Sequence, residues 1–329
     1  MRVLEREGHD GSRRSPKGAD STSGSDGDMG AFAPYDRTVL AEIAHHRRQQ
    51  GTAQRFLEQM SRPARFLDRL ARRVPAVHRA GARIGEAVER VAERLTEAAA
   101  GHGDFATTRD WFWRQGVAVH DWDQIATLPL ADRDRLSTAV PKWWVYGAAE
   151  GGAMGLVQGL ADVAVLPWVG MAAVDATATI WMGAREATMQ AACYGFDPAR
   201  PELRAHLMAA MLPPEDWDLT RYLGMKALLS HPRVAQRALT DLWTRRMTAM
   251  ITDKEATVWL PLAGAVINAA LNGAYLYGVR DSARDYFRLL DLAHRYGADP
   301  VINALDGLAP PAHPPLADVS RLVSPGVEP

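Results

Sequence analysis

The sequence predicts an all-α protein: a compact multi-helix domain built around Gly/Ala-rich helices, with disordered tails at both ends. Three observations lead to this prediction. Apolar residues recur at steps of three and four, Gly and Pro mark the turns, and no run alternates polar and apolar residues between hairpin signals. With 329 residues, of which 47% are hydrophobic, the chain can bury a core in one large domain or two small ones.

Both ends of the chain are predicted to be disordered tails. Residues 1–34 are charged and rich in Ser, Gly and Asp, with few large apolar side chains to offset the entropy of ordering. This opening lacks the apolar run of a signal peptide, so we expect the chain to stay in the cytoplasm. Residues 306–329 contain six prolines, which is typical of an extended and poorly packed tail.

Residues 35–100 are predicted to form a basic amphipathic helical arm. Between Arg47 and Arg83 the sequence has ten Arg, no Lys and two acidic residues, a formal net charge of +8. An apolar stripe runs beside the arginines, and a basic amphipathic helix is typical of binding to an anionic membrane surface. The membrane-surface candidates are Arg62, Arg65, Phe66, Arg69, Leu70, Arg72 and Arg73.

Two other uses of this arm stay open. In one, the apolar stripe packs on the rest of the protein and the arginine face is simply solvated. In the other, the arm binds nucleic acid, which is disfavoured because the segment has two Phe and no recognisable reading module. A second stripe at Ile84, Val88, Val91 and Leu95 predicts a further helix that ends near Gly101.

The remaining helices are predicted to form one domain over residues 105–305. A linker at residues 101–103 leads to an aromatic segment at 111–113, and a further helix begins near Pro129 and runs through charged residues to Arg135. Two later segments are rich in small residues at a spacing of four. Such a spacing leaves a smooth strip on a helix where a second helix can approach closely.

These two small-residue segments are expected to pack together. The first has Gly147, Gly151, Gly155 and Gly159, and the second, residues 256–279, has 24 residues without a charge. Because Pro167 and Pro261 interrupt them, we expect each to form two shorter helices. The second segment exceeds the roughly 20 residues of a membrane span. Its Ala, Gly and Asn content and a mean hydropathy of −0.21 favour a buried helix pair, with a re-entrant hairpin as the alternative.

Six segments in their order resemble the EcsC family of bacterial proteins. They are an acidic helix at 128–135, the Gly-rich segment 147–159, an apolar helix at 169–192, the turn Tyr194-Gly195-Phe196-Asp197, a small-residue segment at 261–272 and a basic aromatic helix at 283–296. The family takes its name from a protein encoded beside an ABC transporter and has no agreed biochemical activity. The resemblance implies a helical domain over about 105–305 and says nothing about residues 31–100.

Four polar residues among apolar neighbours are candidates for lining a ligand cavity: Asp162, Asp175, Asn268 and Asn272. The two carboxylates are also the candidates for acid and base catalysis, with helix capping or pairing with Arg as the simpler interpretation. A helical face shared by Asp175, Thr179 and Glu186 is interpreted as an ordinary polar one.

The two asparagines are expected to bond across helices. A buried amide without partners costs about 1–3 kcal/mol, so each needs a neighbour that donates or accepts. The functional alternative is that Asn268 and Asn272 line a cavity for a polar head group or an ion.

The sequence predicts no metal site and no cofactor. The histidines form no pair four residues apart and no H-E-x-x-H motif, and neither a G-x-S-x-G elbow nor a phosphate-binding loop is present. The run His120-Asp121-Trp122-Asp123 could supply metal ligands, but an Asp at the start of a helix after a loop is interpreted as an N-cap. Cys193, the single cysteine, is interpreted as a small buried side chain.

We therefore expect a non-catalytic EcsC-like protein in the cytoplasm that associates peripherally with the inner face of the plasma membrane. The partner that this implies is an anionic membrane surface. A helical domain that binds a lipid or another hydrophobic small molecule is the second hypothesis. A hydrolase that uses Asp162 or Asp175 is the third. No protein partner follows from the sequence.

Overall fold

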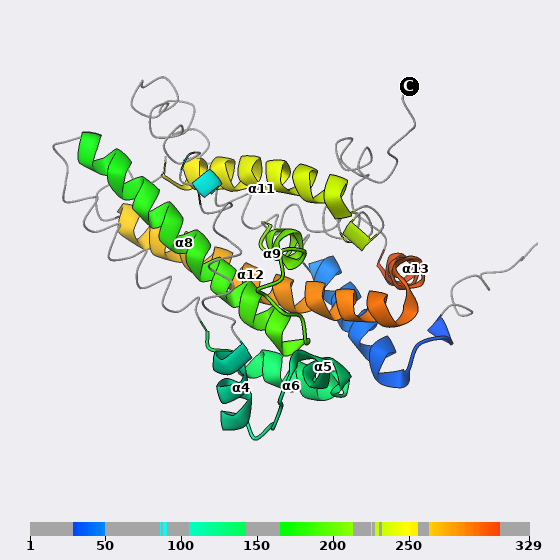
Figure 1. The fold of residues 1–329 in the computed structure, drawn as a ribbon. Coiled ribbons are helices and arrows are strands. Elements are labelled where there is room, and N and C mark those ends of the chain that lie inside the picture. The colour runs from blue at the N-terminus through cyan, green and yellow to red at the C-terminus, as the bar shows by residue number, and fades with distance from the viewer. Residues whose placement is uncertain are drawn as a thin grey trace, which may run out of the picture.

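The computed structural model describes residues 29–49, 86, 88–90, 105–142, 165–212, 225, 228–229, 232–255 and 263–309. Within these ranges every regular element is a helix, so the predicted all-α class is confirmed (Figure 1). The helices are the N-terminal helix (residues 34–49), α4 (Phe105–Arg114), α5 (Trp122–Thr127), α6 (Leu130–Ala139), α8 (Val165–Cys193), α9 (Leu203–Ala210), α11 (Pro232–Glu255), α12 (Ala263–Tyr296) and α13 (Ala298–Leu308).

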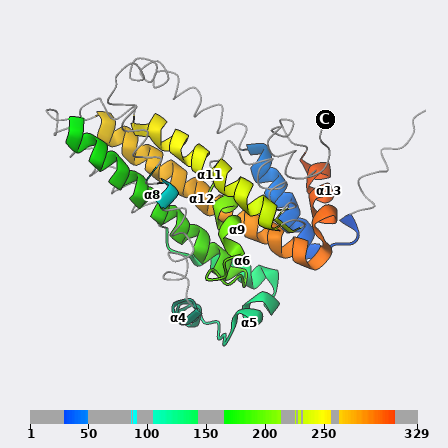
Figure 2. The ribbon, with the colours of Figure 1, turned by 45° about the horizontal axis from the view of Figure 1, so that its top comes forward.

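The two longest helices, α8 and α12, lie side by side and run in the same direction (Figures 1 and 2). Thr179 contacts Asn272, and Glu186 faces Arg280, so facing residues are 93 and 94 positions apart. A constant offset of this kind means that the helices are parallel. Helix α9 packs on both of them and on α11, and α6 packs on the C-terminal half of α8.

Of the two interrupting prolines, Pro167 belongs to α8, and Pro261 lies outside the described residues. The segments ahead of the two helices, including the glycine series 147–159, lie outside the described residues. In the ranges described, no helix has an apolar stretch long enough to cross a membrane.

Helix α12 is one element of 34 residues that contains most of the small-residue segment 261–272 and all of the basic aromatic segment 283–296, which were expected as separate segments. Its C-terminal half is enclosed, and nearly every side chain from Ala283 to Ala293 is buried. The N-terminal helix supplies part of the cover through Val39, Leu40 and Ile43, which have no exposed surface. The beginning of the predicted arm therefore shares the core of the helical domain.

Two ends of the described chain differ slightly from the predicted boundaries. Phe32 of the predicted tail 1–34 is buried in the core, and α13 continues to Leu308 within the predicted tail 306–329. Val88, which belongs to the predicted stripe at 84–95, is also fully buried.

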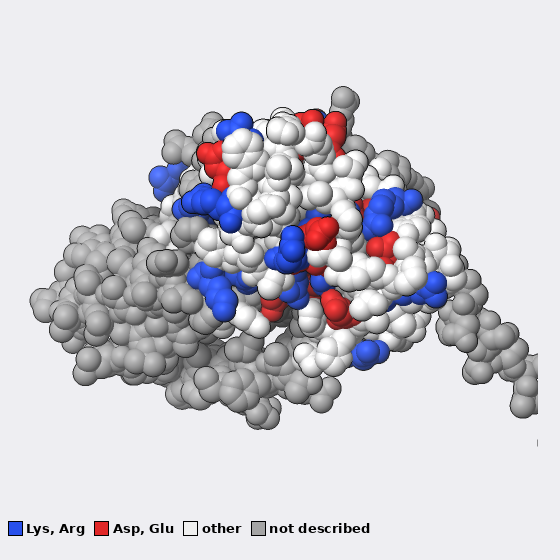
Figure 3. Space-filling model, turned by 90° about the horizontal axis from the view of Figure 1, so that it is seen from below, with Lys and Arg blue, Asp and Glu red and all other residues white. Residues whose placement is uncertain are grey.

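Charged side chains on the surface of the described helices are mixed in sign. On the face seen in Figure 3, Lys and Arg are interspersed with Asp and Glu. Asp132 with Arg135, and Asp197 with Arg200, are pairs three residues apart at 3.7 and 3.6 Å. The described part of this face thus has no patch of a single sign that resembles the basic run of residues 47–83.

The turn after α8 brings the helix end against α5. Gly195 has φ +84°, and the N–H groups of Gly195 and Phe196 donate to the carbonyls of Ala192 and Ala191, which closes the helix as a Schellman motif. A Cβ atom on Gly195 would lie 2.6 Å from the backbone nitrogen of Ala126. Glycine is therefore required here both by the left-handed conformation and by the close approach of two backbones.

Gly195→Ala is expected to destabilise the protein more than Gly116→Ala. Gly116 ends α4 with a similar φ of +79°, but a Cβ there meets nothing within 4 Å. The conformational strain of about 1–2 kcal/mol is common to both variants, whereas only Gly195→Ala adds a collision with Ala126. Urea unfolding followed by circular dichroism measures the difference. Equal losses in the two variants would show that α5 can move away without cost.

Candidate functional site

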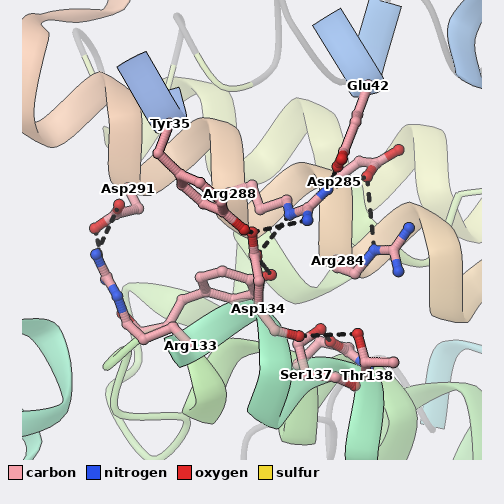
Figure 4. Close-up of polar contacts among 12 residues, drawn as sticks. Tyr35, Glu42, Arg133, Asp134, Ser137, Thr138, Arg284, Asp285, Arg288 and Asp291 are labelled. Carbon is pink, nitrogen blue, oxygen red and sulfur yellow. Dashed lines mark hydrogen bonds and ion pairs between the residues drawn. The ribbon is translucent and has the colours of Figure 1, made fainter. Parts of the chain in front are cut away.

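The carboxylate of Asp134, on α6, is the centre of a buried polar cluster (Figure 4). Its Oδ1 accepts hydrogen bonds from the Tyr194 hydroxyl at 2.6 Å and from Arg288 Nε at 2.7 Å. Its Oδ2 accepts from Arg288 Nη2 and from the Tyr35 hydroxyl, both at 2.8 Å. A carboxylate offers about four acceptor positions, and here all are filled. The donors come from three places: the N-terminal helix, the end of α8, and α12.

Arg133, the neighbour of Asp134, forms a second ion pair with α12, in which α6 supplies the cation and α12 the anion. Its Nη1 and Nη2 donate to the two oxygens of Asp291 on α12 at 2.8 and 3.0 Å, and Nη1 also donates to the Tyr194 carbonyl at 3.2 Å. Asp291 follows Arg288 by three residues on the same helix. Adjacent charges of opposite sign on α6 therefore meet a matching pair on α12, and such two-point pairing fixes the register of the helices.

Polar contacts attach the N-terminal helix to the domain along its length. Asp36 accepts from Arg295 Nη1 at 2.8 Å and from the Tyr296 hydroxyl at 2.7 Å. Further contacts join Glu42 to Arg288 (3.1 Å), His46 to Asp285 (2.9 Å), Arg47 to Asp306 (2.9 Å) and Arg48 to the Leu308 carbonyl (2.8 Å). These contacts place the helix on α12 and α13.

The surroundings of Asp134 fix the protonation of its partners. Burial raises the pKa of Tyr194 well above its usual value, and the nearby Asp134 charge acts in the same direction. Burial and the hydrogen bond to Asp134 raise the pKa of Tyr35 to about 12. Burial would lower the pKa of Arg288, but its hydrogen bonds to Asp134 and the surrounding anions raise it. At neutral pH both tyrosines are therefore neutral donors and Arg288 is a cation.

This arrangement suits a structural role for Asp134. A general base must present a free lone pair to the proton that it abstracts, and every acceptor position of Asp134 is already used. The same four hydrogen bonds hold together helices that are far apart in the sequence.

A second polar group lies between α8, α6 and α12. Glu186 on α8 is 1% exposed, and its Oε1 accepts from Gln190 Nε2 at 3.1 Å. Gln190 Oε1 in turn accepts from the Ser137 hydroxyl at 2.5 Å. Glu186 Oε2 has no hydrogen-bond partner among the described residues. Burial raises the pKa of Glu186 to about 7.

Arg280 is the cation beside Glu186, but it offsets the cost of burying the Glu186 charge only in part. Its Nη1 lies 4.0 Å from Glu186 Oε1, which is the limit of an ion pair. Its shorter contacts are to the carbonyls of Val140 (3.0 Å) and Thr138 (2.8 Å), at the C-terminal end of α6. A cation at this end also offsets the partial negative charge of the helix terminus.

Among the predicted cavity candidates, Asn272 has a described side chain. It is buried and its Oδ1 accepts from the Thr179 hydroxyl at 3.3 Å, which confirms the expected bond across helices. Asp175 and Asn268 lie on α8 and α12, but their side chains are outside the described part. Also outside the described residues are Asp162 and the membrane-surface candidates Arg62, Arg65, Phe66, Arg69, Leu70, Arg72 and Arg73.

The interpretation of Thr179 and Glu186 as part of an ordinary polar face is wrong. Both are buried at the contact of α8 with α12, because α12 covers the side of α8 that the sequence pattern assigned to solvent. Two other interpretations are confirmed. Asp121 caps α5 by accepting from the Gln124 N–H at 2.7 Å, and Cys193 is fully buried.

The Asp134 cluster was not predicted from the sequence, although three of the segments that resemble a known family build it. Residues 128–135, 194–197 and 283–296 supply Asp134, Tyr194 and Arg288, respectively. A signal was present in the last segment, where charged residues are inserted among Phe287, Leu289, Leu290 and Leu292. Charges inside so apolar a stretch must be paired if the helix is buried.

Comparisons of the chain with protein-family models, with curated proteins and with solved structures find no match. Within the described ranges, no group of three or more His, Cys, Asp or Glu side chains is placed to hold a metal ion.

Arg288→Met is expected to lower the free energy of unfolding by about 3–5 kcal/mol, because it leaves Asp134 buried without its cation. Adding Asp134→Asn should recover part of this loss, since the unpaired charge is then removed. The matched control is Arg135→Met, whose arginine is exposed next to the cluster and should change stability by less than about 0.5 kcal/mol. Chemical unfolding of the full chain tests this. An Arg288→Met loss no larger than that of the control would contradict a stabilising role.

Glu186→Gln is expected to make stability less dependent on pH. The folded-state pKa of about 7 lies above the unfolded value of 4.5, so the contribution of Glu186 is present below about pH 4.5 and is lost as pH rises to about 7. The loss is at most about 3 kcal/mol. Urea midpoints of wild type and variant should diverge in favour of the variant as pH rises. Glu202→Gln, at an exposed position, should follow wild type; divergence there too would point to a general charge effect.

Proposed function

We propose that this chain is a non-catalytic, EcsC-like protein that binds the anionic surface of the cytoplasmic membrane through its basic arm. The helical domain holds the start of that arm in a fixed position. The observation that carries the proposal is the attachment of the N-terminal helix, whose contacts with α12 and α13 continue to residue 48.

The first two arginines of the basic run belong to this attachment. Arg47 pairs with Asp306 and its side chain is almost fully buried, while Arg48 donates to the Leu308 carbonyl. Asp306 neutralises the charge of Arg47, whereas Arg48 is exposed and donates only to a neutral carbonyl, so its charge stays available to an external partner. Residues 48–83 contain nine Arg and two acidic residues, a formal net charge of +7. Each basic residue near an anionic membrane contributes about 1 kcal/mol, so this charge suffices for binding.

The use of ionisable groups inside the domain supports a non-catalytic role. The buried charged groups form hydrogen bonds that join α6 to α12, from Arg133 to Asp291 and from Arg288 to Asp134. The mixed charges of the described surface in Figure 3 support the arm, rather than that face of the domain, as the membrane contact.

The geometry also supports the proposed family membership. Three of the six segments that resemble the EcsC family, residues 128–135, 194–197 and 283–296, converge on the Asp134 cluster. The proposed family, and the location at the inner membrane face, follow the resemblance by analogy.

Replacing Arg62, Arg65, Arg69, Arg72 and Arg73 by Gln in the full chain is expected to weaken binding to anionic vesicles at least tenfold at low salt. Co-sedimentation with phosphatidylglycerol-containing and purely phosphatidylcholine vesicles measures the effect. Wild type should prefer the anionic vesicles and should lose that preference at high salt, because salt screens the attraction.

The matched control removes the same number of arginines from the exposed surface of the domain. Its substitutions are Arg114→Gln, Arg135→Gln, Arg200→Gln, Arg237→Gln and Arg245→Gln. The control should bind as wild type does. Equal losses in both variants, or wild-type binding that ignores vesicle charge, would exclude the arm as the membrane contact.

A further inference from the structure

We propose that the contact between His46 and Asp285 is a proton-dependent latch, which holds the last described turn of the N-terminal helix on α12 at low pH and loosens it at high pH. The inference goes beyond membrane binding and does not depend on it. It concerns the last described residues of the predicted arm.

The geometry gives the two partners different access to water. His46 Nδ1 donates to Asp285 Oδ2 at 2.9 Å across 239 residues of sequence. The Asp285 side chain is 2% exposed, whereas that of His46 is 32% exposed. The carboxylate is therefore fixed inside the protein, while the imidazole can exchange its proton with solvent.

When it is protonated, His46 is the described cation that lies closest to the Asp285 carboxylate. Asp285 Oδ1 has no hydrogen-bond partner among the described residues, and the nearest cations, Arg288 Nη1 and Arg284 Nε, stand at 3.7 and 3.9 Å. Asp281, one turn earlier on α12, adds a second negative charge that acts on His46. Within the described part, the N-terminal helix contributes Glu42, which is paired with Arg288, and the ring of His45 at 6.5 Å.

The direction of the pH effect follows from this setting. The hydrogen bond to Asp285 raises the pKa of His46 above 6.5, against the opposing effect of burial. The contribution of the latch is thus complete below about pH 6.5 and is lost as pH rises through the raised value. The other described side-chain contacts of this helix with the domain use Arg, Tyr and carboxylate groups, which do not ordinarily titrate near neutral pH.

Loss of the proton removes the positive charge of His46, so that the ion pair becomes a weaker hydrogen bond from a neutral imidazole to the Asp285 carboxylate. The loss of this attraction should make opening of the last described turn about five- to tenfold more frequent. The adjacent Arg47–Asp306 pair remains charged and keeps the helix from leaving the domain altogether. The latch therefore changes local opening more than global unfolding.

Amide hydrogen exchange of residues 43–49 in the full chain tests the proposal at about pH 6 and about pH 9, with rates corrected for intrinsic exchange. Wild-type protection should fall by about five- to tenfold at the higher pH. His46→Lys, which stays cationic at both values, should keep its protection. His46→Gln, which is neutral at both, should show no comparable fall.

The control is His45→Gln, at the exposed neighbouring position, which should reproduce the wild-type fall. Protection of core amides in α12, followed in the same samples, separates local opening from global unfolding. The proposal is overturned if wild-type protection is the same at both pH values, or if His46→Gln loses protection as wild type does.

Discussion

The carboxylate of Asp134 is buried where four parts of the chain meet, and its charge is tolerated only when all four are in place. A buried carboxylate that lacks its cation costs several kcal/mol, whereas Asp134 has a bidentate arginine and two tyrosine hydroxyls. The N-terminal helix, α6, the end of α8 and α12 thus depend on one another. Apolar packing alone would hold them together but would leave their register less well defined.

This dependence explains the position of α12 at the centre of the fold. The apolar side chains of α12 fill the core, and its Arg288 and Asp291 form ion pairs with the two oppositely charged residues of α6. The parallel neighbour α8 adds its own polar contacts, with Asn272 bonded to Thr179 and Glu186 facing Arg280. The contacts of α12 with α6 and with α8 therefore combine burial with polar interactions that favour a single alignment.

The local signals of the sequence were sufficient for the helical class, for the Asp121 cap and for the burial of Cys193, because each depends on neighbouring residues. Contacts between distant segments were not predictable in the same way. Asp134 and Arg288 are 154 residues apart, and a helical pattern assigns both to solvent by default. The change from uncharged to charged residues within α12 resembled a boundary, although the charged half is covered by other helices. Glu186 was misassigned for the same reason.

The attachment of the N-terminal helix has a consequence for synthesis of the protein. Tyr296 bonds to Asp36 from 260 residues away, and Asp306 pairs with Arg47 across 259 residues. At ribosomal rates of roughly 5–20 residues per second, the helix waits on the order of 10–50 s for these partners to be made. During that time the apolar face formed by Val39, Leu40 and Ile43 has no α12 to cover it. The burial of this face is therefore completed only after α12 and α13 have been synthesised.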